Sequence, residues 1–135
     1  MGRMVALDHG SRRIGVAVSD PLGITAQPVG MIPAGAAFLG QLETMLAQWE
    51  VDLIVVGLPV GLDGREGAAA VGARRFAAEV AAATGHQTVL YDERFSTVVA
   101  ERAMIEGGAR RDRRRLRRDG VAAAVFLQGY LDGGR

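Results

Sequence analysis

Acidic residues border three separate apolar stretches of this sequence. Asp8 ends the first apolar stretch, Asp92 and Glu93 end a later one, and Asp119 stands just before the last. A carboxylate loses favourable hydration wherever it is drawn out of water, so acids at the borders of buried segments are expected to have a binding partner. These acids lie far apart in the sequence, so only the fold can bring them together at one site.

The composition restricts the chemistry of such a site. The chain has no cysteine and only two histidines, His9 and His86, too few for a histidine-built metal site. Carboxylates brought together repel one another unless a cation neutralises them. A cluster of acids without cysteine or histidine therefore favours a hard divalent cation on oxygen ligands, and Mg²⁺ or Mn²⁺ fits best.

Each acid also has an ordinary structural interpretation. Asp119 could cap a helix, and Asp8 could close a turn. Arg94, which follows Glu93, could pair with a neighbouring carboxylate at the surface. Taken singly these interpretations are the stronger ones, and only the conjunction of the acids favours an active site.

The first elements that must position these acids are strands. Residues 4–8 and 14–19 are predicted strands joined by the turn HGSRR, the second with apolar residues in alternation. A third strand is predicted over residues 24–32, where Pro28 is compatible only with an edge or bulged position. The chain is therefore predicted to open with three antiparallel strands.

Helices and strands then alternate. Helical spacing predicts an amphipathic helix from Phe38 to Trp49, followed by the buried strand DLIVVGL. After the loop GLPVGLDGREG comes a second helix that ends at Gly85, and then the fifth strand, QTVLYDE. One stripe of that second helix is predicted to hold Gly72, Phe76, Val80 and Ala83.

The C-terminal part is predicted to be helical. Ser96 is a suitable N-cap for a helix over residues 97–106, and Gly107 and Gly108 end it. The last helix, GVAAAVFLQGYL, is apolar nearly all round, so we expect it to lie buried against the sheet with Asp119 at its start.

The order of these elements predicts an α/β fold with a mixed five-stranded sheet flanked by helices, in one domain over residues 1–135. Ligand sites in open α/β sheets gather outside the carboxyl ends of the parallel strands, where Asp8, Asp92 and Glu93 are expected. The apolar runs are short and the N-terminus does not resemble a signal peptide, so we expect a cytoplasmic protein without a membrane span.

Basic residues are concentrated in one segment. The net charge is only +1, yet ARRDRRRLRRD, residues 109–119, holds seven of the sixteen basic residues. Such a run is a common footprint of nucleic-acid binding, although a solvated arginine-rich loop is an equally ordinary explanation.

Four ordered blocks, LDHGSRRIGVAVSD, GLPVGLDG, DERFST and RRDGVAAAVFLQGYLD, resemble the YqgF/RuvX family over Val5 to Asp132. That family is assigned to Holliday junction resolution and to maturation of the 5′ end of pre-16S ribosomal RNA. The resemblance implies an RNase H-like fold and a hydrolase acting on phosphodiester bonds. Residue by residue, it implies catalytic and metal-binding roles for Asp8, Glu93 and Asp119.

The remaining site predictions rank below these three acids. Asp92 should point to the face opposite Glu93 if the strand continues that far, and His9 is interpreted as a turn histidine. The backbone of Gly57 and Gly64 would allow close approach of a phosphate or a partner strand. The resemblance implies substrate contact for both glycines, with Arg12, Arg13 and Arg94 as candidate phosphate partners. The basic segment adds Arg110, Arg111, Arg113, Arg114 and Arg115.

Three functional hypotheses follow. The first is a nuclease that uses Mg²⁺ or Mn²⁺ on pre-ribosomal RNA or on branched or single-stranded DNA. The second is a non-catalytic assembly factor that binds RNA or a junction through Arg110 to Arg118. The third, an ATP-binding relative of sugar kinases and actin, is disfavoured because that arrangement needs two such domains. The sequence leaves open RNA against DNA, endo- against exonuclease action, one or two metal ions, and a homodimer.

Overall fold

The sheet of the computed structural model, which describes residues 2–61, 63–95 and 120–134, has five strands in the order β3-β2-β1-β4-β5. The strands are β1 Arg3–His9, β2 Arg13–Ser19, β3 Ala26–Pro33, β4 Val51–Leu58 and β5 Thr88–Asp92. Strand β2 is antiparallel to β1 and β3, whereas β4 is parallel to β1 and β5. This confirms the predicted mixed sheet and the RNase H-like arrangement of three antiparallel strands followed by parallel ones.

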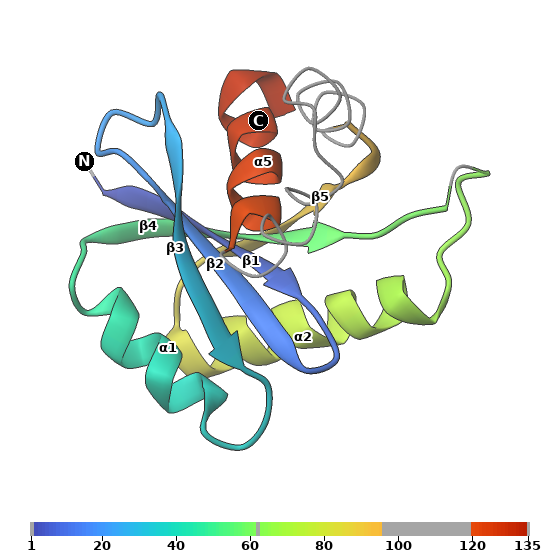
Figure 1. Cartoon of the computed structure of the whole chain (residues 1–135), viewed down its shortest axis with the longest axis horizontal. Coiled ribbons are helices and arrows are strands. Elements are labelled where there is room, and N and C mark those ends of the chain that lie inside the picture. Colours follow the sequence, from blue (N-terminus) through green and yellow to red (C-terminus); the bar gives the residue numbers. More distant parts are fainter. Residues whose placement is uncertain (1, 62, 96–119, 135) are drawn as a thin grey trace.

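Helices cover both faces of the sheet (Figure 1). Helices α1, Phe38–Leu46, and α2, Ala68–Thr84, lie on one face, and α5, Val121–Gly129, lies on the other. A short π-helical turn, η1, Tyr130–Gly134, continues from α5. In the described part of the chain, no helix combines the length and hydrophobicity that crossing a membrane requires.

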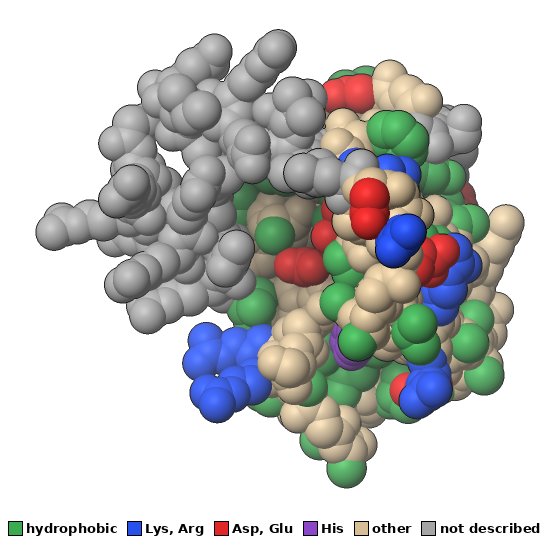
Figure 2. Space-filling view, turned by 90° about the vertical axis from the view of Figure 1, so that its right-hand side faces the viewer, with side chains coloured by type: hydrophobic (Ala, Val, Ile, Leu, Met, Phe, Trp, Pro, Cys, Tyr) green, Lys and Arg blue, Asp and Glu red, His purple; other side chains and the backbone are tan. Residues whose placement is uncertain are grey.

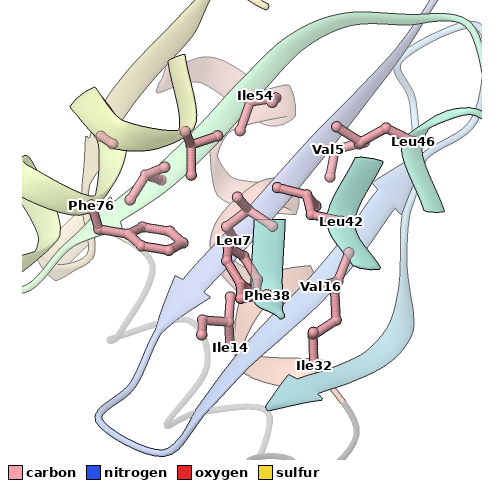
Figure 3. Packing of buried hydrophobic residues seen from close by; sticks show 13 residues of the cluster. Val5, Leu7, Ile14, Val16, Ile32, Phe38, Leu42, Leu46, Ile54 and Phe76 are labelled. Atoms are coloured by element: carbon pink, nitrogen blue, oxygen red, sulfur yellow. The ribbon is translucent and has the colours of Figure 1, made fainter. Parts of the chain in front are cut away.

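The larger core lies between the sheet and helices α1 and α2 (Figure 3). Alternate residues of β1 point into it, so Val5 and Leu7 pack with Leu42 of α1 and Phe76 of α2. The intervening Ala6 faces α5. The same alternation assigns Asp8 to the α5 face and His9 to the α2 face.

The core under α5 is built largely from small residues. Ala6 and Ala17 of the sheet pack against Ala123 and Ala124 of the helix, and the larger Phe126 and Leu127 are also buried. Small side chains on both sides let the helix approach the strands closely. The prediction that this apolar helix lies buried against the sheet is confirmed.

Three local predictions differ from the structure. The third strand begins at Ala26 rather than near residue 24, because the Asp20 carboxylate accepts the N–H groups of Ile24 and Thr25 and holds them in a turn. Helix α1 ends at Leu46, and Trp49 lies in the turn that follows. Ala83 of α2 is exposed, since the buried stripe consists of Ala70, Ala73, Phe76, Ala77 and Val80.

Two further predictions are confirmed. Pro28 lies on the edge strand β3, next to an irregularity in the pairing with β2. Gly85 ends α2 in the left-handed conformation, with φ 73°, and its N–H donates to the carbonyl of Ala81. The predicted helix over residues 97–106 and its cap Ser96 lie outside the described residues.

Candidate active site

Asp8 occupies the carboxyl end of β1, on the side of the sheet that α5 covers. It pairs in register with Gly15 of β2, and a Cβ atom on Gly15 would lie 3.4 Å from the Asp8 Cβ atom. The same point is 3.4 Å from the Cα atom of Gly120, which precedes α5. Asp8 is therefore a neighbour of the start of α5.

Gly120 brings the start of α5 onto the sheet. Its φ of 77° is a left-handed conformation that favours glycine. A Cβ atom there would lie 2.6 Å from the carbonyl oxygens of Val16 and Gly30, so no other residue fits without movement of the backbone. Asp119, joined covalently to Gly120, lies outside the described residues.

Glu93 approaches the same place from β5. Its backbone N–H donates to the carbonyl of Leu58 over 3.1 Å, which extends the pairing of β4 with β5 by one residue. Its carboxyl group lies on the bare backbone of Gly57, where an added Cβ atom would overlap Oε1 of Glu93 and approach the Phe126 ring to 2.9 Å. Glu93 thus faces α5, on the same side of the sheet as Asp8.

The pKa of Glu93 reflects the proximity of Asp8. Burial raises the pKa of the Glu93 carboxyl group from 4.5 to about 7, and the negative charges of Asp8 and Asp92 act in the same direction. The strand register agrees, because Leu7 pairs with Val56 and the next residues along these parallel strands are Asp8 and Gly57. Two acids from β1 and the end of β5 therefore share one site.

A divalent cation suits this donor set. Two carboxylates that disfavour each other's ionisation are stabilised by a nearby positive charge, and carboxylate oxygens are the ligands that Mg²⁺ and Mn²⁺ prefer. Within residues 2–61, 63–95 and 120–134, no group of three or more acidic or histidine side chains is close enough to hold a metal ion. A third protein ligand would have to come from the remaining part of the chain, where Asp119 lies.

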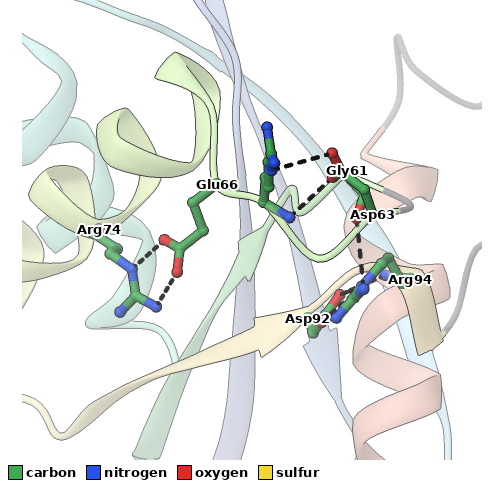
Figure 4. Close-up of polar contacts among 7 residues, drawn as sticks. Gly61, Asp63, Glu66, Arg74, Asp92 and Arg94 are labelled. Atoms are coloured by element: carbon green, nitrogen blue, oxygen red, sulfur yellow. Dashed lines mark hydrogen bonds and ion pairs between the residues drawn. The ribbon is translucent and has the colours of Figure 1, made fainter.

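Asp92 binds Arg94 (Figure 4). Its neighbour Tyr91 packs in the core under α5, so strand alternation turns the Asp92 side chain to the opposite face of the sheet. The Arg94 guanidinium donates Nε and Nη2 to Oδ2 of Asp92 over 3.0 and 2.7 Å. These hydrogen bonds hold the pKa of Asp92 below its ordinary value. The prediction that Asp92 and Glu93 face opposite sides is confirmed. Arg94 pairs with a neighbouring carboxylate, which is the ordinary structural interpretation given for it above.

Arg94 also contacts the loop between β4 and α2. Its Nη1 lies 3.5 Å from the carbonyl oxygen of Gly61 and 3.9 Å from the position of a Cβ atom on Gly64, whose φ of 82° favours glycine. Glu66, at the end of the loop, is bound to Arg74 of α2 by two hydrogen bonds. The loop is therefore anchored on both sides (Figure 4), and contact of Gly64 or Arg94 with a substrate stays a prediction.

The other predicted substrate contacts lie only partly within the described residues. Arg12 is exposed in the turn between β1 and β2, and Arg13 is the exposed first residue of β2, next to the carboxyl end of β1. Acidic and basic side chains both reach the surface of the molecule in the view of Figure 2. Arg110, Arg111, Arg113, Arg114 and Arg115 lie outside the described residues.

His9 and Gly57 have structural surroundings that explain their residue types. The His9 ring stacks on Phe76 of α2, with ring centroids 4.5 Å apart, on the face opposite Asp8. Gly57 is buried in β4, and the group that approaches its backbone closely is the Glu93 carboxyl group rather than a phosphate or a partner strand. Contact of Gly57 with a substrate stays a prediction. The apolar wall that Phe126 provides for Glu93 was missed by the sequence analysis, although a glycine inside an apolar strand signals close approach of another group.

Comparisons with known proteins agree with this description. The family model RuvX, described as Holliday junction resolvase, matches residues 2–133. Two relatives are each named "Putative pre-16S rRNA nuclease". The one from Anaeromyxobacter sp. is 46% identical and the match covers 97% of both chains. The one from Myxococcus xanthus is 44% identical, over 98% of this chain and 89% of the relative.

Among solved structures, T. thermophilus RuvC in complex with Holliday junction substrate matches with a TM-score of 0.42 and 15% identity, over 68% of this chain and 65% of that chain. The family match and the identities of 44–46% over nearly the whole chain confirm the resemblance found in the four sequence blocks. The chain belongs to the RuvX family.

Proposed function

We propose that this chain is a metal-dependent nuclease that hydrolyses phosphodiester bonds. The observation that carries the proposal is the convergence of Asp8 and Glu93 at the carboxyl ends of β1 and β5, where burial and then the charge of Asp8 raise the pKa of Glu93. Two carboxylates that repel each other lower the stability of the metal-free fold. Such a pair is therefore expected where the two acids bind a cation.

The proposed roles follow from position. Asp8, on a central strand of the sheet, is the rigid ligand, and Glu93 is the second ligand, held on Gly57 beside Phe126. Asp119 is proposed as the third, because it is joined to Gly120, whose Cα atom lies beside Gly15 and Asp8. When bound at these carboxylates, Mg²⁺ or Mn²⁺ would polarise the phosphodiester and lower the pKa of an attacking water.

The proposed substrate is nucleic acid, with pre-16S ribosomal RNA first because the relatives carry that name. Branched DNA is the second candidate, since the family model is described as Holliday junction resolvase. The arginine-rich segment 109–119 supplies the charge for phosphate contacts in either case. A cytoplasmic location suits both substrates.

The test compares wild type with Asp8→Asn on labelled single-stranded RNA, single-stranded DNA and a four-way junction, each with Mg²⁺, Mn²⁺ or EDTA. We expect cleavage only with a divalent cation, and a loss of about 100-fold or more in Asp8→Asn, because the ligand charge is removed. Asp52→Asn is the matched control, because Asp52 is exposed at the opposite end of the sheet, where its carboxylate accepts the N–H of Gly2.

Two outcomes would contradict the proposal. Cleavage that persists in Asp8→Asn would remove this residue from the active site. Equal binding of nucleic acid by both proteins, with no cleavage under any metal condition, would instead favour a non-catalytic assembly factor that acts through its basic segment.

A further inference from the structure

A glycine stands at an unexpected place in the interior of the sheet. Gly57 lies in the buried run Ile54–Leu58 of β4, between β1 and β5. Glycine weakens the interior of a strand, because it offers no side chain for packing and loses more backbone freedom on folding. Gly57 is not among the described glycines with positive φ, so its backbone conformation does not require the absence of a side chain.

The space that Gly57 leaves empty is filled by the Glu93 carboxyl group. A Cβ atom at this position would overlap Oε1 of Glu93 and lie 3.1 Å from its Cδ atom. The Phe126 ring of α5 forms the other wall, 2.9 Å from the same point. Even the smallest side chain in place of glycine would therefore displace the carboxylate, the phenyl ring or both.

Glu93 has little freedom to avoid such a displacement. Its backbone is fixed to β4 through the hydrogen bond from its N–H to the Leu58 carbonyl, and Tyr91, two residues earlier, is buried in register with Gly57. With the backbone held at β5, the side chain must cross β4 at Gly57 to bring its carboxylate toward Asp8 in β1. The Glu93 side chain therefore lies across the bare backbone of Gly57.

We propose that Gly57 is a positioning residue for the active site: by lacking a side chain, it sets where the Glu93 carboxylate lies relative to Asp8. This inference rests on the proposed metal-dependent function for its effect on activity. Its structural content, a steric coupling between Gly57 and Glu93, does not depend on that function. A role for Gly57 in general core packing would instead couple it to Phe126.

The central variant is Gly57→Ala, with Gly40→Ala as the matched control, because a Cβ atom on Gly40 of α1 meets nothing within 4 Å. We expect Gly57→Ala to lower the affinity for Mn²⁺, measured by titration calorimetry, by about 10-fold or more, as for other residues that orient a ligand. The kcat of cleavage should fall while KM for the nucleic acid is unchanged. Gly40→Ala should change none of these.

Two double variants separate the explanations. Glu93→Asp shortens the side chain by one methylene, so Gly57→Ala combined with Glu93→Asp should bind Mn²⁺ more tightly than Gly57→Ala alone. Gly57→Ala combined with Phe126→Leu should not recover Mn²⁺ binding. The inference is overturned if Gly57→Ala binds Mn²⁺ as wild type does, or if Phe126→Leu restores binding and Glu93→Asp does not.

The same variants still test the inference if Gly57→Ala folds poorly, or if wild type neither binds Mn²⁺ nor cleaves nucleic acid. The free energy of unfolding in urea, measured in EDTA, then replaces the metal titration. Stability recovered by Glu93→Asp and not by Phe126→Leu supports the steric coupling, and the opposite pattern overturns it. Failure of wild type to cut any substrate would overturn the proposed function while leaving this coupling to be decided by the double variants.

Discussion

At the scale of single residues, the protonation of Glu93 links the active site to the stability of the fold. Its pKa is about 7 in the folded chain, against an ordinary value of 4.5. Between these values the folded state keeps a proton that the unfolded state has lost. The free energy of unfolding therefore has a contribution that is fully present below pH 4.5 and is lost as the pH rises through 7.

Replacing Glu93 with Gln should remove this contribution. In EDTA, we expect the Tm of wild type to fall relative to that of Glu93→Gln as the pH rises from 4.5 to about 7. The relative change should be roughly 10 °C, because a pKa raised from 4.5 to about 7 corresponds to about 3 kcal/mol, and about 1 kcal/mol shifts the Tm of a domain of this size by several degrees. Thermal unfolding followed by circular dichroism at a series of pH values measures it.

Two variants control this pH experiment. Glu43→Gln, at an exposed position of α1, should give a Tm profile parallel to wild type. Asp8→Asn should give a smaller pH-dependent fall than wild type, because it removes the neighbouring charge while leaving the burial of Glu93. Parallel profiles for wild type and Glu93→Gln would show that the Glu93 carboxyl group titrates normally in the folded chain.

The residues of the site differed in how far the sequence could predict them. Asp8 and Glu93 were predictable because each follows an apolar stretch whose strand ends at the same edge of the sheet, and strand alternation separated Glu93 from Asp92. The packing of Glu93 against Gly57 and Phe126 was not, because it joins three elements that local patterns do not relate. The pairing of Arg94 with Asp92 was one of two interpretations that the sequence left open.

At the scale of elements, the loop between β4 and α2 is held against the strand end that carries Glu93. Arg94 connects Asp92 to the Gly61 carbonyl, and Glu66 connects the loop to Arg74. Arg94→Gln should loosen the loop and leave the global Tm nearly unchanged, because a pair at the surface contributes at most about 1 kcal/mol. We expect trypsin to cut after the exposed Arg65 roughly 2- to 5-fold faster than in wild type.

Arg75→Gln is the control for the trypsin experiment, because Arg75 is exposed on α2 and forms none of the ion pairs found among the described residues. An unchanged rate of cleavage after Arg65 in Arg94→Gln would show that the Arg94 side chain does not restrain the loop. A large fall in Tm would show instead that Arg94 belongs to the cooperative core.

The end of α2 offers a second test at this scale. Gly85 has φ 73° and nothing lies within 4 Å of its added Cβ position, so only backbone strain opposes a side chain there. Gly85→Ala should lower the free energy of unfolding by about 1 kcal/mol. Gly40→Ala, in the first turn of α1, should raise it by up to about 1 kcal/mol. Urea unfolding of both variants measures the contrast, and equal effects would contradict the left-handed cap.

Element boundaries and buried faces were predictable where the local signal was strong. Gly85 marked the end of α2 because a left-handed cap favours glycine, and Pro28 marked an edge strand because proline lacks the N–H that a central strand needs. The buried stripe of α2 was predicted incompletely. Alanines occur on all sides of that helix, so hydrophobicity alone did not distinguish the buried Ala73 and Ala77 from the exposed Ala83.

At the scale of the whole molecule, the sequence separates Asp8 and Glu93 from the densest run of positive charge. Asp8 and Glu93 come from the sheet, whereas seven of the sixteen basic residues lie within residues 109–119. If the acids serve cleavage and the arginines serve phosphate binding, the two activities respond to different variants. Binding then depends on salt through the arginines, because each neutralised phosphate releases counterions.

The salt dependence of binding tests this division. Replacing Arg110, Arg111, Arg113, Arg114 and Arg115 together with Gln should flatten the plot of log Kd against log salt by about 0.7 for each single-strand phosphate that is no longer neutralised. Asp8→Asn should keep the wild-type slope while abolishing cleavage, and Arg75→Gln should change neither. Anisotropy of labelled single-stranded RNA in EDTA measures the slopes without cleavage. An unchanged slope in the five-residue variant would place the phosphate-binding residues elsewhere, with Arg12 and Arg13 at the carboxyl end of β1 as the next residues to replace.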